Sequence, residues 1–331
     1  MSGTPGDQSA APGDRRVLVL THTGRAEAVS VARQVVDSLR AHRISVRLLI
    51  DEGGQLGLSE APGLELVVEE DAAAGCELAV VIGGDGTILR AAELTHGSGT
   101  PLLGVNLGHV GFLAEAESED IEATIAAIVE RRYTSEERLT IDVGVYRDNE
   151  LVTSTWALNE ASVEKASRER MIEVVVGIDG RPLSRWACDG VVCATPTGST
   201  AYNFSAGGPV VWPGVDALLM VPLSAHALFA RPLVVAPDSV MVIDVLDRNE
   251  GAGVLWCDGR RREELPPGAR IEVRRGRMPV RLARLHQAPF TDRLVAKFGL
   301  SVDGWRGAAE RRRGADSGGA SGGDPRGGMS A

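Results

Sequence analysis

Two patterns of apolar and polar residues divide the chain. Up to residue 137, short apolar runs alternate with stretches that carry apolar residues at helical spacing. From residue 138, apolar and polar residues alternate over many short segments punctuated by Gly, Pro and Asp. The first pattern is typical of a parallel sheet covered by helices. The second is typical of a sheet-rich domain, so the chain is expected to hold an α/β domain followed by a β domain.

Five short aliphatic runs in the first region are expected to form buried strands: residues 17–22, 44–50, 64–70, 77–82 and 101–106. Helical spacing of apolar residues separates the first two of them, over 28–39. Residues 88–92 and 121–132 indicate two further helices. Because strands and helices alternate in this order, residues 15–137 are expected to form an α/β domain with a Rossmann-like parallel sheet.

The second region, residues 138–285, is expected to form a mainly β, sandwich-like domain. Apolar and polar residues alternate on both sides of Asp148 and Asn149, a pair that favours a hairpin turn. The one stretch of this region that could hold a helix is 203–221.

The chain is then expected to return to its first domain over residues 286–305. Leu294, Val295 and Phe298 fall on one helical face, which predicts a final helix that packs back on the N-terminal domain. The two ends, residues 1–14 and 306–331, are built mainly of small and polar residues, and both are expected to be disordered.

Composition narrows the class of protein. The chain has 331 residues, of which 44% are hydrophobic and 24% charged, as in an ordinary globular protein. Its formal net charge of -10 offers no general electrostatic basis for binding nucleic acid or a membrane. The start lacks the apolar core of a signal peptide, and no run reaches the roughly 20 apolar residues of a membrane span. We therefore expect a cytoplasmic protein whose four cysteines, with no CxxC pair, are buried thiols.

Several motifs that carry known chemistry are absent from the sequence. There is no G-x-x-x-x-G-K-[ST] loop, and the dinucleotide pattern G-x-G-x-x-G fails at Leu89. The protein-kinase motifs and H-E-x-x-H are also missing. One G-x-S-x-G match, at 319–323, lies in the tail with no strand before it. Among the histidines, only His109 stands in a glycine-rich turn of the kind that often carries function.

The segment Gly83-Gly84-Asp85-Gly86-Thr87 lies between a predicted buried strand and a predicted helix. Glycines let the backbone approach a ligand closely, and a helix N-terminus favours anionic groups. The segment therefore has the character of a phosphate loop. An ordinary strand-to-helix turn, with Asp85 as its N-cap, explains the same residues equally well from turn chemistry alone.

Two further segments are unusually rich in glycine and hydroxyl groups. The first, residues 106–113, follows the next predicted strand, so it either shares a crevice with the glycine turn or serves as a simple linker. The second comprises 158–161, 189–190 and 195–209 of the β domain. It has the character of a nucleoside-binding loop with Tyr202 available for stacking, and a Ser/Thr-rich surface loop is the other interpretation.

Together these segments resemble the NAD kinase family. The stretches GGDGT, NLGHVGFL, NEASVEK and DGVVCATPTGSTAYNFSAGGPVV match it in order and wording, and the resemblance spans residues 15–305. GGDGT alone is shared with diacylglycerol-type lipid kinases and 6-phosphofructokinases, so the NE and TPTGSTAY segments carry the specificity.

The resemblance implies a bacterial-type enzyme that transfers the terminal phosphoryl group of ATP, or of inorganic polyphosphate, to the 2′-hydroxyl of the adenosine ribose of NAD, giving NADP. It further implies a divalent cation, Mg²⁺ or Mn²⁺, without naming its ligands. Family members commonly form homodimers or homotetramers through the β domain, so a homo-oligomer is expected, with no nucleic-acid or membrane partner.

Carried over residue by residue, the resemblance makes Asp85 the group that accepts the proton of the attacking hydroxyl or orients it. The implied NAD-binding residues are Asp85, Gly86, Arg90, Asn159, Glu160, Arg170, Asp189, Thr200, Ala201, Tyr202, Asn203, Phe204 and Ser205. The implied phosphate loop consists of Gly83, Gly84, Gly86 and Thr87. Arg260 stands where relatives often carry Gln, so no role is assigned to it, and Ala187 stands where many carry a basic residue.

Two rival functions share parts of this pattern. A lipid kinase would also use GGDGT, but it would be expected to show a basic or amphipathic interfacial element, which this acidic chain lacks. A non-catalytic NAD(P) sensor would use the same pocket, and the retained Asp85 speaks against it. Arginines at 260–262, 274–284 and 311–313 suit either a polyanionic donor or a solvated surface.

Overall fold

The computed structural model describes residues 15–301, apart from 109–110, 118–119, 167–169, 248–252 and 287–288. His109, the two predicted tails and the arginines at 311–313 therefore lie outside the described residues. By its internal contacts the chain divides into two compact units, residues 1–287 and 288–331.

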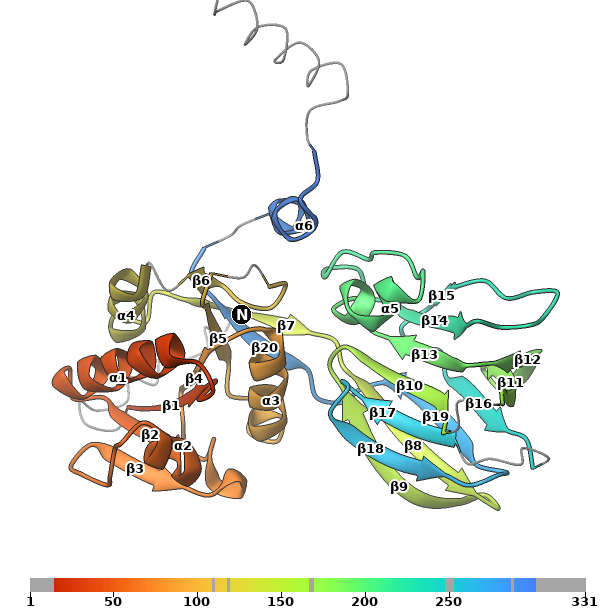
Figure 1. The fold of residues 1–331 in the computed structure, drawn as a ribbon, viewed down its shortest axis with the longest axis horizontal. Helices are drawn as coiled ribbons and strands as arrows, with labels where there is room; N and C mark the ends of the chain where they lie inside the picture. Colours follow the sequence, from red (N-terminus) through yellow and green to blue (C-terminus); the bar gives the residue numbers. More distant parts are fainter. Residues whose placement is uncertain are drawn as a thin grey trace, which may run out of the picture. The chain divides into compact units, whose positions relative to one another are not determined.

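The first domain is built on an eight-stranded, mostly parallel sheet with the order β3-β2-β1-β4-β5-β20-β7, and β6 pairs with β5 (Figure 1). Its strands are β1 (Arg16–Thr21), β2 (Ser45–Leu49), β3 (Leu64–Val67), β4 (Leu78–Ile82), β5 (Leu102–Asn106), β6 (Ala116–Glu117), β7 (Thr134–Arg138) and β20 (Val280–Arg284). The order 3-2-1-4-5 and the parallel pairing of its strands are those of a Rossmann-like sheet, which confirms the predicted fold class.

Helices cover this sheet on both faces, as Figure 1 shows. They are α1 (Ala26–Ala41), α2 (Ile50–Gln55), α3 (Asp85–Thr95) and α4 (Ile121–Val129), with a short 3-10 turn, η1 (Glu69–Asp71). Strand β1 alternates between the faces: Val17 and Val19 pack in one apolar cluster with α1 and α4. Leu18 and Leu20 pack in another with α3. The strand is buried on both faces, which explains its continuous apolar run.

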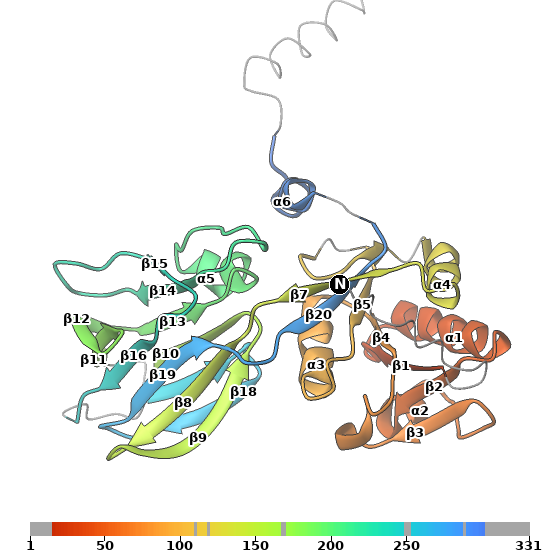
Figure 2. The same ribbon diagram turned by 180° about the vertical axis from the view of Figure 1, so that it is seen from behind.

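Strand β20 corrects the domain assignment made from the sequence. The apolar run at its position was expected to belong to the β domain of residues 138–285. In the structure β20 pairs in parallel with β5 and antiparallel with β7. Figures 1 and 2 both show it alongside β7. The chain therefore returns to the first sheet before residue 285. It leaves this sheet for the second domain after β7 and comes back to it at β20.

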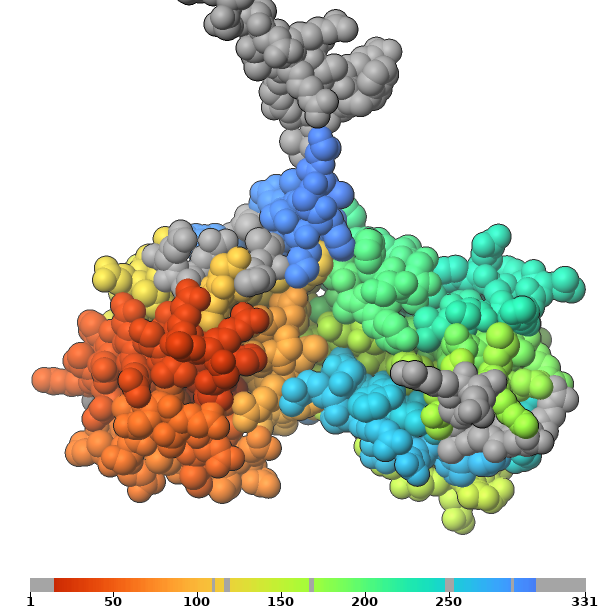
Figure 3. Space-filling model, viewed as in Figure 1, coloured from red at the N-terminus to blue at the C-terminus, as the bar shows by residue number. Residues whose placement is uncertain are grey.

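The second domain is a sandwich of two six-stranded sheets with the orders β15-β14-β13-β10-β17-β18 and β12-β11-β16-β19-β8-β9. Its elements are β8 (Ile141–Arg147), β9 (Glu150–Ala157), β10 (Glu160–Lys165), β11 (Ile172–Ile178), β12 (Arg181–Cys188), β13 (Gly190–Ala194), η3 (Gly198–Thr200), α5 (Tyr202–Ser205), β14 (Leu218–Leu223), β15 (Leu233–Val235), β16 (Met241–Val245), β17 (Gly253–Cys257), β18 (Arg261–Leu265) and β19 (Arg270–Arg275). Residues from both sheets share one buried core, among them Val143, Val163, Val174 and Val191. In Figure 3 the early residues, in red and orange, and the green and cyan residues of the sandwich gather in separate regions of the surface.

Local turn chemistry behaves as expected in this domain. Asp148 and Asn149 connect β8 to β9 with φ of 51° and 65°. Asp and Asn tolerate this left-handed region, and two such residues in succession match the right-handed twist of a hairpin. Only the short α5 forms a helix within 203–221.

The predicted final helix is present as α6 (Phe290–Phe298), and Gly299, with φ of 58°, ends it in the usual left-handed conformation. It belongs to the unit of residues 288–331, and its packing on the N-terminal domain stays a prediction. All four cysteines are free thiols, and Cys188, Cys193 and Cys257 are buried. Within the described residues, the structure has no helix of the length and apolarity that a membrane span requires.

Candidate active site

The glycine turn joins β4 to α3. Gly83 has φ of 153°, and a Cβ at this position would lie 2.5 Å from Thr87 Oγ1, so the tight turn requires glycine. Gly84 occupies the N-cap, without a side-chain cap, and Asp85 is the first residue of α3. Asp85 is therefore not the N-cap that the alternative interpretation expected, and its carboxylate is directed elsewhere.

The carboxylate of Asp85 contacts the segment after β5. Oδ2 accepts a hydrogen bond from the N–H of Phe112 at 3.0 Å, and Oδ1 accepts one from Leu113 at 3.2 Å. A Cβ on Gly111 would lie 2.3 Å from Asp85 Oδ1, so only glycine allows this approach. Because β4 and β5 are neighbours in the sheet, their carboxyl-end loops meet, which agrees with the first of the two interpretations of residues 106–113.

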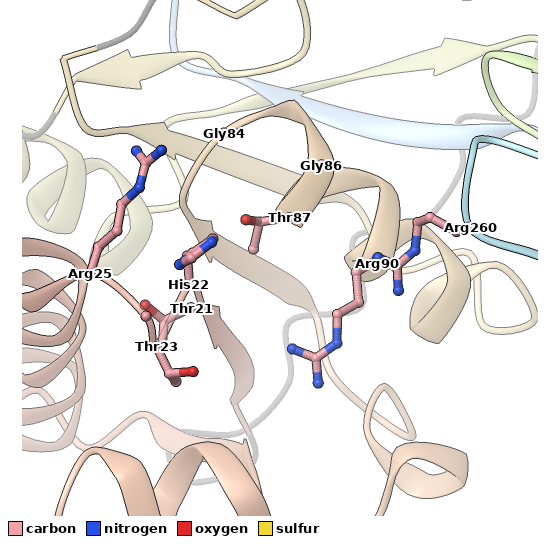
Figure 4. Close-up of a pocket in the computed structure, with 10 residues that line it drawn as sticks. Thr21, His22, Thr23, Arg25, Gly84, Gly86, Thr87, Arg90 and Arg260 are labelled. Atoms are coloured by element: carbon pink, nitrogen blue, oxygen red, sulfur yellow. The ribbon is translucent and has the colours of Figure 1, made fainter.

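A cavity of about 480 Å³ opens beside the glycine turn. Its lining residues are Thr21, His22, Thr23, Gly24, Arg25, Gly84, Gly86, Thr87, Arg90 and Arg260. Figure 4 shows Arg25 and His22 on one side of Thr87, and Arg90 and Arg260 on the other. Three guanidinium groups, one imidazole and the N-terminus of α3 make this cavity suited to a polyanion.

Several of these lining residues were not identified as candidate site residues from the sequence. The run Thr21–Arg25 begins with the last residue of buried β1 and continues beyond the carboxyl edge of the sheet, the place where open α/β sheets bind ligands. Their position at the carboxyl end of a predicted buried strand was the one signal that could have identified them as candidate site residues. Arg260 was left without a role, yet it lines the cavity and its Nε donates to Glu93 Oε2 at 3.1 Å.

The turn Leu158–Glu160, the NE turn, is held by a residue far along the chain, Asp258. Its carboxylate accepts the N–H groups of Leu158 at 3.0 Å, Asn159 at 2.7 Å and Glu160 at 3.3 Å. Arg261 Nη2 donates to the same carboxylate at 2.8 Å. Burial raises the pKa of Asp258, and these four donors oppose that rise. Asp258 therefore positions the turn, a role that the sequence analysis did not assign.

Glu160 is buried and has an unusual charge state. Burial raises its pKa to about 8, the nearby charge of Asp258 adds to the rise, and the N–H of Tyr202 opposes it. Glu160 is therefore largely protonated at neutral pH and can donate a hydrogen bond. Its Oε2 is buried and has no hydrogen-bond partner among the described residues.

The Thr/Ser-rich segment, residues 195–209, packs on this turn through Thr195 and Gly198. The N–H of Thr195 donates to Asn159 O at 2.9 Å, and its hydroxyl donates to Leu158 O at 2.6 Å. A Cβ on Gly198 would lie 2.0 Å from Asn159 O, which explains the glycine. The first part of the segment, Thr195 to Gly198, is therefore fixed against this turn.

Residues 202–205 divide into buried and exposed members. Asn203 is fully buried, and its amide donates to Ser199 O at 3.3 Å and Pro209 O at 3.2 Å, so this side chain shapes the loop. Tyr202 and Phe204 are 37% and 43% exposed, which leaves both residues with surface for a ligand. The Tyr202 hydroxyl is hydrogen-bonded to Glu164.

Of the remaining expected residues, Thr200 and Ala201 are half-buried, whereas Ser205 is exposed. Lys165 Nζ lies 2.5 Å from Asp189 Oδ1, and this hydrogen bond lowers the pKa of Asp189. The charge of Asp189 also acts on Tyr202. Arg170 is exposed and directly follows 167–169, which lie outside the described residues.

One apolar cluster connects the two halves of the site. Leu113, next to the contact with Asp85, and Leu158, next to Asn159, are both buried in it together with Ile88 of α3. The glycine turn, the 106–113 segment and the NE turn are thus parts of one packed arrangement.

The described residues contain no group of three or more His, Cys, Asp or Glu that could hold a metal ion. The chain thus lacks a cation cage of its own within that part. Mg²⁺ that enters on the phosphates of a nucleotide needs no such cage, because it keeps waters and phosphate oxygens as ligands.

Known proteins resemble this chain over most of its length. The sequence models of the ATP-NAD kinase N-terminal and C-terminal domains match residues 17–133 and 158–285. The NAD kinase of Thermobifida fusca is 61% identical over 306 residues, covering 90% of this chain and 94% of that protein. NAD kinase 2 of Streptomyces coelicolor is 60% identical over 297 residues, covering 89% and 97%.

Solved structures share the fold. Yeast NADH kinase in complex with NADH superposes with a TM-score of 0.79 at 24% identity, covering 88% of this chain and 89% of that chain. An NAD kinase from Archaeoglobus fulgidus in complex with ATP gives a TM-score of 0.66 at 24% identity, covering 87% and 100%. With both domain models matched and relatives near 60% identity over nine-tenths of its length, the chain belongs to the NAD kinase family.

Proposed function

We propose that this chain transfers the terminal phosphoryl group of ATP to the 2′-hydroxyl of the adenosine ribose of NAD, giving NADP, and that Asp85 faces that hydroxyl. NAD kinase activity itself follows from the family. The donor, the cation and the residue roles are the proposal. The bound NADH and ATP of the two solved relatives support a fold that takes both nucleotides.

The observation that carries the proposal is the place of Asp85. Gly84, Gly86 and Thr87, its immediate neighbours, line the cationic cavity, while its carboxylate contacts the loop that packs against the NE turn. A carboxylate between the cationic cavity and the segments proposed to bind NAD stands where an acceptor hydroxyl must meet a donor phosphate. Phosphoryl transfer depends mainly on such positioning and on charge stabilisation.

Asp85 is well prepared to orient a hydroxyl. The N–H groups of Phe112 and Leu113 fix both of its oxygens, and each oxygen retains a further lone pair. One of these can accept the hydrogen bond of the 2′-hydroxyl, align its oxygen for in-line attack and take its proton as the new P–O bond forms. The half-buried side chain stays accessible for that contact.

The cationic cavity is the proposed donor site. Arg90, Arg260 and Arg25 supply charge for phosphate oxygens, and the ring of His22 and the backbone at Gly84 and Gly86 can add hydrogen bonds. Among the described residues that line it, none is Phe, Tyr or Trp, so phosphate binding dominates over stacking of a base. The same chemistry suits inorganic polyphosphate, which is the second candidate donor.

The NE turn and the Thr/Ser-rich segment form the proposed NAD site. A protonated Glu160 and the amide of Asn159 can donate hydrogen bonds to the nucleoside, and the ring of Tyr202 can stack on its base. Arg170, Asp189, Thr200, Ala201 and Ser205 stay in the proposed set through the family resemblance. For Asn203 we propose a supporting role, because its amide is used within the loop.

A divalent cation, Mg²⁺ or Mn²⁺, is proposed to enter with the phosphates of the donor, where it neutralises charge on them. We also propose a cytoplasmic location and a homodimer or homotetramer. Trp212, Leu228 and Phe229 of the β domain carry exposed apolar surface that suits an oligomer interface.

The direct test is to incubate the purified chain with NAD and Mg²⁺, adding ATP in one reaction and inorganic polyphosphate in another, and to assay NADP. NADP is expected with ATP, and the polyphosphate reaction measures the second donor. No NADP with either donor would overturn the proposal. NADP with polyphosphate alone would replace ATP as the donor.

A further inference from the structure

Glu52 is a buried acid beside the cationic cavity, the proposed donor site, which is called the donor cavity below. Neither the family motifs nor the roles proposed above include Glu52. It lies in α2, and its side chain is only 4% exposed. Oε2 accepts the N–H of Thr21 at 2.9 Å, and Oε1 accepts Arg90 Nη1 at 2.7 Å. Both oxygens are therefore in use, one on each of two residues that line the cavity.

The two contacts have different consequences. Thr21 is the last residue of β1, buried and fixed by the sheet, so its N–H is a rigid anchor for the carboxylate. Arg90 is 31% exposed and has a long, flexible side chain. Glu69, which also pairs with Arg90, is 63% exposed, and its Oε1 lies 3.4 Å from Arg90 Nη2, the limit of a hydrogen bond. The buried carboxylate therefore decides where the Arg90 guanidinium rests.

We propose that Glu52 is a positioning residue for phosphoryl transfer: it is anchored by Thr21 and holds the Arg90 guanidinium at the donor phosphates. The inference rests on the proposed function. It assigns Glu52 to the donor half of the reaction, because within the described residues its two hydrogen bonds go to Thr21 and Arg90 and not to the NE turn or the Thr/Ser-rich segment.

A neutral side chain in place of Glu52 separates this role from simple packing. Glu52→Gln keeps the size of the side chain and removes the charge that attracts Arg90. We expect the KM for ATP to rise at least about fivefold, the scale of one charge-assisted hydrogen bond. The KM for NAD should stay within about twofold, because a loss confined to donor binding leaves acceptor binding intact.

Glu65→Gln is the matched control. Glu65 also pairs with arginines of the α/β domain, Arg47 at 2.8 Å and Arg16 at 3.1 Å, but unlike Arg90 these arginines do not line the donor cavity. Both KM values of this variant should equal those of the wild type within about twofold, the effect expected of a partly exposed pair.

A double-mutant cycle tests whether Glu52 acts through Arg90. The KM for ATP of Glu52→Gln/Arg90→Gln should equal that of Arg90→Gln alone, since Glu52 has nothing left to position. Additive effects on the KM for ATP would overturn the inference, as would an equal rise of both KM values in Glu52→Gln.

If Glu52→Gln does not fold, Glu52→Asp, which keeps the charge but shortens the reach, is subject to the same measurements. If the wild type forms NADP and the KM for ATP is unchanged in these variants, only the role of Glu52 is refuted. If the wild type forms no NADP, the proposed function itself is refuted.

Discussion

The N–H of Phe112 donates to Asp85 Oδ2 at 3.0 Å, so the carboxylate that is proposed to orient the acceptor hydroxyl is itself oriented by the loop of the neighbouring strand. The second oxygen is bound in the same way by Leu113. Two backbone donors hold the carboxylate plane more firmly than flexible side chains could, because the sheet fixes both loops. The neighbouring positions of β4 and β5 in the sheet thus place the carboxylate of Asp85. Substitutions of Asp85 and of the loop that contacts it test this contact.

Asp85→Asn should lower NADP formation at least about 10²-fold, the lower end of general-base contributions, while NAD still binds. The amide can accept a hydrogen bond at one position only and cannot take the proton. Steady-state kinetics and NAD titration of the variant measure the two effects separately. Asp37→Asn, at an exposed position of α1, is the control and should keep full activity. Full activity of Asp85→Asn would remove the proposed role.

Gly111→Ala tests the other end of the same contact. Its Cβ would lie 2.3 Å from Asp85 Oδ1, so either the loop or the carboxylate must shift. A displacement of this size is expected to lower kcat by about 10²-fold, the effect that a misplacement of about 1 Å can have. Gly97→Ala, where no heavy atom lies within 4 Å of the new Cβ, should leave kcat unchanged. Equal kcat values for the two variants would show that the Gly111 contact does not matter.

Asp258→Ala should both destabilise the protein and weaken NAD binding. The substitution leaves the buried N–H groups of Leu158 and Asn159 without their acceptor. Losing these bonds is expected to cost about 2–4 kcal/mol in the free energy of unfolding. Urea unfolding measures the stability, and the KM for NAD should rise while the KM for ATP changes less. A rise confined to the KM for ATP would contradict the assignment of this turn to NAD.

Glu160 predicts a pH dependence of stability. Its pKa is about 8 in the folded chain against 4.5 as the ordinary value, so the folded state binds more protons than the unfolded state between these pH values. The contribution of Glu160 is therefore fully present below about pH 4.5 and is lost as the pH rises through 8. The size of this loss is on the order of a few kcal/mol.

Glu160→Gln cannot titrate and should lack this part of the pH dependence. Thermal unfolding at pH 6 and pH 9 should show a smaller decrease in Tm for the variant than for the wild type. Equal decreases would mean that Glu160 is ionised in the folded protein at both pH values. Glu150→Gln, at an exposed end of β9, is the control and should match the wild type.

Much of this protein follows from local sequence patterns. The apolar face of α1, the buried run of β4 and the hairpin at Asp148 and Asn149 were all predictable, because periodicity and turn chemistry act over a few neighbouring residues. The glycine turn was predictable for the same reason. The family resemblance then supplied the chemical interpretation of Asp85 and of the NE turn.

Tertiary structure alone decided the contacts between distant segments. The strand at 280–284 has an ordinary apolar pattern, and only pairing with β5 and β7 places it in the first sheet. Asp258 meets the NE turn across about a hundred residues of chain, and Arg260 joins Thr21 and Arg90 around one cavity. A sequence pattern records which face of an element is buried, but not which partner covers it. The anchors of the active site are such partners, so they became visible only in the folded chain.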